Sequence, residues 1–142
     1  MLSSSGLMLL DPANGKTRLD YEWKIAQFRA LQPHVVGSDT ILLPTGNDGG
    51  ILTCIDLQTG ERKWKGGRYG KGQILLLENS ELLLILSEQG QVVLVAADPS
   101  EHREIASFQA LEGKTWNHPV LVGDRLYVRN SQEAAAYRVQ LN

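Results

Sequence analysis

Residues 50–64 read GILTCIDLQTGERKW, and this stretch decides the fold. A mostly apolar segment at 51–57 leads into a polar turn, and a charged segment at 61–64, which ends at Trp64, returns. An aspartate at the start of a turn accepts backbone N–H groups, and glycine supplies a positive φ. We therefore expect a hairpin whose turn is built by Asp56 and Gly60, with Trp64 on its outer edge.

The turn motif and a second motif recur along the chain. The first runs from Asp11 to Gly15, then from Asp56 to Gly60, 45 positions later, and returns after 42 more at Asp98, without the glycine. The second, at 33–37, returns 86 positions later at 119–123. A period near 42 residues with about four strands per unit is the signature of β-propeller blades.

Short apolar runs separated by turn residues cover the whole chain. Strands at such spacing indicate an all-β fold. Two of the runs, 74–77 and 82–86, do not alternate with polar residues, so we expect sheets that are covered on both faces. The stretch 21–31 has helical character but is equally a strand with an irregular connection. The expected strands are 7–10, 17–23, 34–36, 40–43, 51–57, 61–64, 74–77, 82–86, 92–97, 104–108, 120–122, 126–128 and 135–141.

These patterns predict an all-β, partial β-propeller of about three four-stranded antiparallel blades. We take residues 1–142 as one domain, with repeat units at roughly 1–31, 32–72, 73–115 and 116–142. Because 142 residues hold only about three and a half units, we expect either a dimer of two three-blade arcs that completes a ring of six, or further blades upstream. An eight-blade pair is the less favoured variant.

The motif D-x-x-T-G-x-x-x-W, which ends at Trp64, resembles the pyrroloquinoline-quinone (PQQ)-like propeller repeat. The C-terminal part is similar to the last blades of bacterial proteins related to the propeller lipoprotein of the outer-membrane assembly machinery. The resemblance implies a mostly non-enzymatic, extracytoplasmic family with eight blades. It also implies that Trp64 docks between neighbouring blades, a role that Phe108 takes in the third unit.

Composition excludes several classes of protein. The chain has 14 basic and 16 acidic residues, and a net charge of −2 argues against a dedicated nucleic-acid binder. The apolar runs, such as 82–86 and 92–97, are far shorter than the ~18 residues of a membrane helix. Cys54 is the single cysteine, so an intrachain disulfide is impossible. The opening MLSSSGLMLL lacks the basic residues of a signal peptide, which leaves the compartment open: a cytoplasmic protein, or a mature piece of a longer, periplasmic or other extracytoplasmic one.

The glycine-rich stretch 66–72, GGRYGKG, is the most suggestive candidate for a binding loop. A loop of this kind can hold a phosphate, but the Walker pattern fails at both ends and no helix follows. We therefore interpret it as a connection between blades that exposes Arg68, Tyr69 and Lys71 for recognition.

Histidines and one tryptophan give the remaining candidates. Trp116 and His118 precede a strand, and we expect them on an exposed loop. His34 stands at the equivalent end of its unit, where turn and packing roles are favoured over a site at the axis. We expect His102, in a polar loop, to be solvated.

We identify no catalytic residue, metal ligand or cofactor site in this sequence. A quinoprotein dehydrogenase needs a calcium ion held by oxygen ligands, and no segment has such spacing. The favoured function is a non-catalytic scaffold that presents residues 68–71 and 116–118 to a protein partner. The alternatives are a quinone-dependent dehydrogenase or its remnant, and a small-molecule or sugar binder that uses Trp116 and Tyr69 near the propeller axis.

Overall fold

Antiparallel strands build nearly all of the regular structure in the computed structural model. Backbone is described for the strands that precede residue 50, and side chains from Gly50 onward. Among the described residues, fourteen strands form four sheets, and one short 3-10 helix, η1 (Glu78–Ser80), joins two consecutive strands of the third sheet. The described residues are 2–3, 6–10, 17–21, 31–36, 39–44, 50–56, 59 and 61–141.

Each sheet is a meander in which strands pair in chain order. The first sheet holds β1 (Leu2–Ser3), β2 (Gly6–Leu10) and β3 (Thr17–Tyr21). The second holds β4 (Leu31–Val36), β5 (Asp39–Pro44), β6 (Leu52–Asp56) and β7 (Arg62–Gly66). The third holds β8 (Gln73–Leu77), β9 (Leu82–Leu86), β10 (Gln91–Ala96) and β11 (Glu104–Gln109). The fourth holds β12 (Val120–Val122), β13 (Arg125–Arg129) and β14 (Ala134–Arg138).

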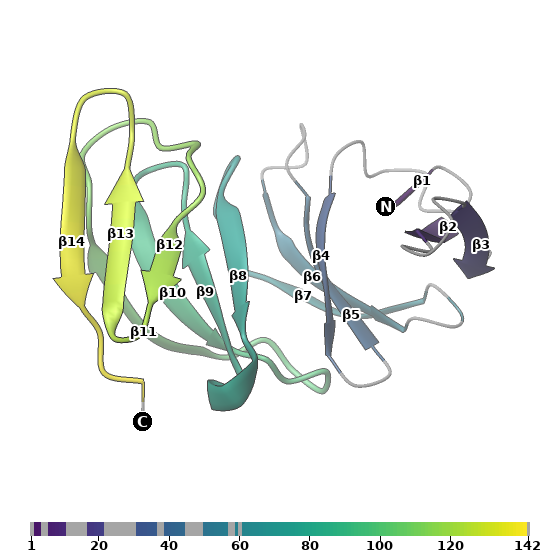
Figure 1. Ribbon diagram of the computed structural model, residues 1–142. Coiled ribbons are helices and arrows are strands. Elements are labelled where there is room, and N and C mark those ends of the chain that lie inside the picture. The colour runs from purple at the N-terminus through teal and green to yellow at the C-terminus, as the bar shows by residue number, and fades with distance from the viewer. Residues whose placement is uncertain are drawn as a thin grey trace.

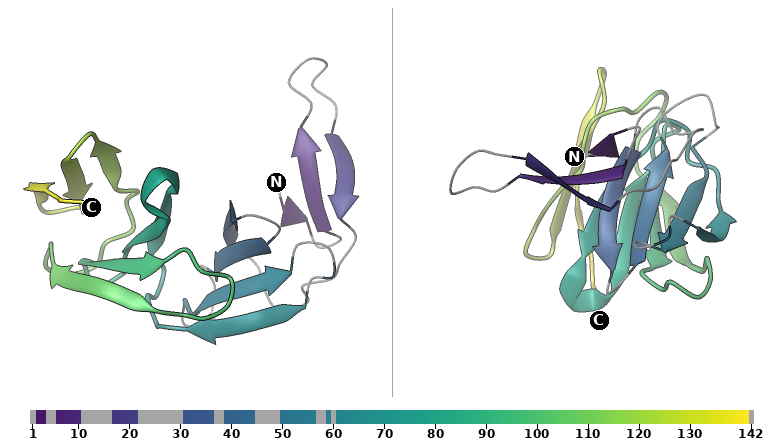
Figure 2. Two further views of the ribbon diagram at one scale, coloured as in Figure 1. Left: turned by 90° about the horizontal axis from the view of Figure 1, so that it is seen from below. Right: turned by 90° about the vertical axis from the view of Figure 1, so that its right-hand side faces the viewer.

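The sheets follow one another along an open arc, from the N-terminal sheet to the C-terminal sheet (Figure 1; Figure 2, left). Two of them have four strands and two have three among the described residues. This arrangement confirms the predicted all-β, partial propeller.

The expected strands all coincide with observed ones, with small differences at their ends. The two-residue strand β1 was not predicted, and η1 occupies the polar turn after β8, where Glu81 closes the turn with a φ of 51°. In the stretch 21–31 only the two end residues are described, as strand, so the helical alternative lies outside the described residues.

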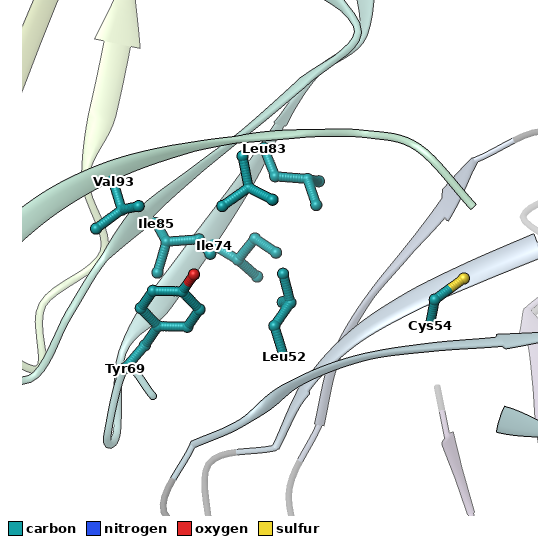
Figure 3. Packing of buried hydrophobic residues seen from close by; sticks show 8 residues of the cluster. Leu52, Cys54, Tyr69, Ile74, Leu83, Ile85 and Val93 are labelled. Atoms are coloured by element: carbon teal, nitrogen blue, oxygen red, sulfur yellow. The ribbon is translucent and has the colours of Figure 1, made fainter. Parts of the chain in front are cut away.

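Strand β9 is buried on both of its faces. Leu83, Leu84, Ile85 and Leu86 have no exposed surface, and they alternate between two apolar clusters. Leu83 and Ile85 pack against the second sheet in a cluster that includes Leu52, Cys54, Tyr69, Ile74, Val93 and Val95 (Figure 3). Leu84 and Leu86 pack toward the fourth sheet in a cluster that includes Val92, Ala110, Leu111, Leu126 and Val128.

The prediction of two buried faces is therefore confirmed for β9 and is only partly right for β8. Leu75, Leu76 and Leu77 of β8 are half-buried, whereas Ile74 is fully buried. The reason is position, since β8 is the edge strand of its sheet and has a hydrogen-bonded neighbour on one side only.

Candidate functional site

The glycine-rich stretch connects β7 of the second sheet to β8 of the third, as expected for a link between blades. Its path requires glycine: Gly67 has a φ of 65° and Gly70 a φ of 62°, a region that other residues enter at a cost. A Cβ atom on Gly50, whose φ is 61°, would overlap the carbonyl group of Gly70. The connection therefore lies directly against Gly50, just before β6.

Backbone hydrogen bonds join this connection to two further turns. The Tyr69 amide donates to the Gly50 carbonyl at 2.9 Å, and the Glu88 amide donates to the Tyr69 carbonyl at 2.8 Å. The Thr115 amide then donates to the Glu88 carbonyl at 2.9 Å. Thr115 is fully buried, so the backbone that carries the next residue, Trp116, is anchored to the protein.

Trp116 is an exposed aromatic side chain whose indole is hydrogen-bonded. Half of its surface (52%) is accessible, although its indole Nε1–H donates to Glu88 Oε1 at 2.9 Å. The Lys71 and Lys114 ammonium groups lie 5.4 Å and 5.6 Å from the ring centroid, within cation–π range. We call Trp116, Glu88, Lys71 and Lys114 the Trp116 platform.

Glu88 is the anchor of the platform. Its second carboxylate oxygen, Oε2, accepts the Lys71 backbone amide at 3.1 Å. The hydrogen bond from the Trp116 indole, then that from the Lys71 backbone, hold the pKa of Glu88 below its ordinary value. Both bonds favour the carboxylate form, so at neutral pH Glu88 is ionised and binds the indole and the connecting loop together.

The expectation that Tyr69 is an exposed recognition residue is wrong. Its side chain is 3% exposed and packs against Leu52 and Ile74 between the second and third sheets (Figure 3). The hydroxyl donates to Glu104 Oε1 at 2.7 Å and lies 3.0 Å from His102 Nε2. Burial, and then the Glu104 carboxylate, raise the pKa of Tyr69. The apolar faces of two neighbouring sheets remove this ring from solvent, which the sequence of a glycine-rich loop does not reveal.

His102 is also placed differently from the expectation. It is half-buried rather than solvated, because its ring lies against Gly66 and is 5.7 Å from the Trp64 ring. Since the single hydroxyl hydrogen of Tyr69 goes to Glu104, the His102 Nε2 atom is the donor in its contact with Tyr69. Tyr69, His102 and Glu104 thus form a polar contact between two sheets.

Aromatic residues on outer strands reach the next sheet. The Trp64 indole on β7 donates to the Asp98 carbonyl at 3.1 Å, in the loop between β10 and β11. Phe108 on β11 packs edge-on against Tyr137 on β14, with 5.0 Å between ring centroids. These two contacts join the second sheet to the third, and the third to the fourth.

The Asp56 turn shows how the repeat motif closes a hairpin. Asp56 Oδ1 accepts the Thr59 amide at 2.8 Å, and the Asp56 amide donates to the Glu61 carbonyl at 2.8 Å. Asp98 forms a similar local contact with the Ser100 amide at 2.8 Å. Three predicted structural residues, Asp11, Gly15 and Gly60, lie outside the described residues, as does the side chain of His34.

The remaining predicted recognition residues do not gather at one place. Arg68 is exposed on the connection and is not part of the Trp116 platform. His118 is exposed and lies at a cavity of about 350 Å³ on the outward face of the fourth sheet. That cavity is lined by His118, Val120, Tyr127, Val128, Arg129, Ala134, Ala135 and Ala136.

The structure thus brings Lys71 and Trp116 together and adds two residues that the sequence analysis missed. Glu88 lies 28 positions before Trp116, in the turn between β9 and β10, and nothing in its local sequence marks it. Lys114 lies two positions before Trp116, and this short separation was the one feature of the sequence that could have pointed to its contact with the ring.

The described residues also bear on metal binding and on membrane crossing. Within this part of the chain, no group of three or more His, Cys, Asp or Glu side chains is arranged to hold a metal ion. None of its helices is long and apolar enough to cross a membrane.

The stacked antiparallel sheets define the chain as a partial β-propeller. Among solved structures it is similar to BamB from Moraxella catarrhalis, with a TM-score of 0.55 and 14% sequence identity. The similarity covers 94% of this chain but 37% of that one, so the chain spans little more than a third of the BamB structure. It confirms the predicted resemblance to BamB-like propellers at the level of fold. No family model matches the chain. A search of curated proteins finds no match either.

Proposed function

We propose that the protein is a non-catalytic interaction module that binds a protein partner through the Trp116 platform. The observation that carries this proposal is an exposed tryptophan whose indole is hydrogen-bonded to Glu88 in the free chain. Tryptophan is enriched among the residues that dominate binding energy at protein interfaces. A side chain that is already ordered loses less conformational entropy on binding, which favours affinity.

The backbone around Trp116 supports the same proposal. Thr115 is anchored to Glu88, and the Asn130 side chain donates to the Glu112 carbonyl at 2.8 Å, so the loop is tied to two neighbouring turns. A sugar-binding site that pairs Trp116 with Tyr69 loses its second aromatic, because Tyr69 is buried.

Site-specific photo-crosslinking in the native host tests the proposal. p-Benzoylphenylalanine replaces Trp116 in one strain and the exposed Glu101, in the β10–β11 loop, in a control strain. We expect a discrete protein adduct at position 116 that is absent at position 101. Adducts of equal yield at both positions, or none at 116, would refute an interaction surface at the platform.

We propose further that a second copy of the chain covers the outward face of the fourth sheet. Val120, Val122 and Tyr127 are 52%, 63% and 45% exposed there, and together they form an apolar patch of the kind that marks an interface. The described residues form four sheets per chain, so two copies would supply eight sheets rather than the six expected from residue count.

Light scattering coupled to size-exclusion chromatography tests this second-copy contact. We expect a species of twice the 15.7 kDa monomer mass at low micromolar concentration, and its loss in Val122→Glu. A stable, folded species at the monomer mass would refute it.

A further inference from the structure

We infer that the partner segment bound at the Trp116 platform is acidic, with carboxylates that pair with Lys71 and Lys114. The inference rests on the proposed function, because it specifies the chemistry of the partner at the same site. Two ammonium groups lie near one exposed ring, and both interact electrostatically with the Glu88 carboxylate beside it.

The carboxylate of Glu88 is already committed to other donors. One oxygen accepts the Trp116 indole and the other accepts the Lys71 backbone amide. Among the described residues, neither lysine ammonium lies within salt-bridge distance of a carboxylate. The platform therefore presents two positive charges whose direct hydrogen-bonding capacity is available to a ligand.

The neighbouring carboxylates define the side from which an acidic segment approaches. On the side of the fourth sheet, Glu133 accepts the Glu112 amide, which places negative charge beside the 110–115 loop. The connection that carries Lys71 also carries Arg68, which is exposed. An acidic segment is therefore favoured over the Lys71 side of Trp116, with its apolar residues against the indole.

Other ligand chemistries fit the platform less well. A sugar site built on Trp116 and Tyr69 lacks its second aromatic ring, because Tyr69 is buried. A nucleic acid needs an extended basic surface, whereas this chain has a net charge of −2. A short acidic peptide matches both the local positive charge and the single aromatic anchor.

Two synthetic decapeptides test the inference with the purified full chain. In one, aspartate and glutamate alternate with leucine; in the matched control, lysine replaces every acidic residue. The indole N–H resonance of Trp116, assigned by its loss in Trp116→Phe, reports binding by NMR. We expect the acidic peptide to shift it saturably and the lysine peptide to leave it unchanged.

Charge variants then separate this inference from the proposed function. Exposed ion pairs each contribute up to a few-fold in affinity and reversal adds repulsion, so Lys71→Glu with Lys114→Glu should weaken acidic-peptide binding about tenfold. Lys71→Arg with Lys114→Arg should retain binding. Absence of a saturable shift with the acidic peptide, equal binding of both peptides, or no effect of charge reversal would overturn the inference.

Repeating the cross-linking at position 116 in the charge-reversed background completes the test. Loss of the adduct supports an acidic partner. A protein adduct that persists would overturn the acidic segment while leaving the proposed function intact. A nucleic-acid adduct in place of protein would overturn both.

Discussion

Adjacent residues on β9 test directly whether the third sheet is covered on both faces. Leu84 and Ile85 are both fully buried but belong to opposite clusters, one toward the fourth sheet and one toward the second. Truncation to alanine removes three carbon atoms, worth about 2.4 kcal/mol of transfer free energy at about 0.8 per methylene group. With the cavity that remains, each of Leu84→Ala and Ile85→Ala should lower the free energy of unfolding by about 2–5 kcal/mol.

The assay is urea denaturation followed by circular dichroism, with Ile105→Ala, on a residue 47% exposed, as the matched control. The control should cost less than about 1 kcal/mol. In a sheet with one wet face, only one of two adjacent positions is buried. A cost below about 1 kcal/mol for either Leu84→Ala or Ile85→Ala would therefore refute the stacked-sheet arrangement.

Three further substitutions test the connections between sheets, each measured by chemical denaturation. Gly50→Ala should lower the free energy of unfolding by more than about 3 kcal/mol, because the new Cβ overlaps Gly70 and the φ is positive. The control Gly113→Ala, with a φ of 80° but open space around it, should lower it by about 1–2 kcal/mol. Similar losses for both variants would contradict the close approach of Gly50 to Gly70. Tyr69→Phe should cost about 1–3 kcal/mol by leaving Glu104 and His102 without their shared hydroxyl, and the exposed Tyr127→Phe should be nearly neutral. The folded-state pKa of Glu88 lies below its ordinary value, so wild type should be more stable than Glu88→Gln above about pH 5. That advantage should be lost as the pH falls through the lowered pKa. A stability difference between the two proteins that does not change with pH would argue against an ionised Glu88.

Much of the architecture could be predicted because its determinants are local. The apolar run at β9 predicts a strand, and the turn at Asp56 predicts a hairpin, each from a few neighbouring residues. Non-alternating leucines correctly predicted that β9 is covered on both sides, since burial of both faces removes the need for polar residues.

The candidate site could be predicted only in part, because it forms between segments distant in sequence. Lys71 and Trp116 are 45 positions apart, and Glu88, which binds both, belongs to a third segment. The exposure of Tyr69 was wrongly predicted for the same reason. Its loop is polar and rich in glycine, but two neighbouring sheets bury the ring. Contacts between sheets depend on how the blades are placed, which periodicity does not specify.

The affinity of the partner captured at position 116 tests the central claim most directly. Calorimetric titration of that partner should show binding at least about 30-fold weaker for Trp116→Ala than for wild type, as expected for a tryptophan that dominates an interface. The control Ile105→Ala should bind within about twofold of wild type, the limit for a residue outside the interface. Equal dissociation constants for wild type and Trp116→Ala would contradict the assignment of the Trp116 platform as the interaction surface.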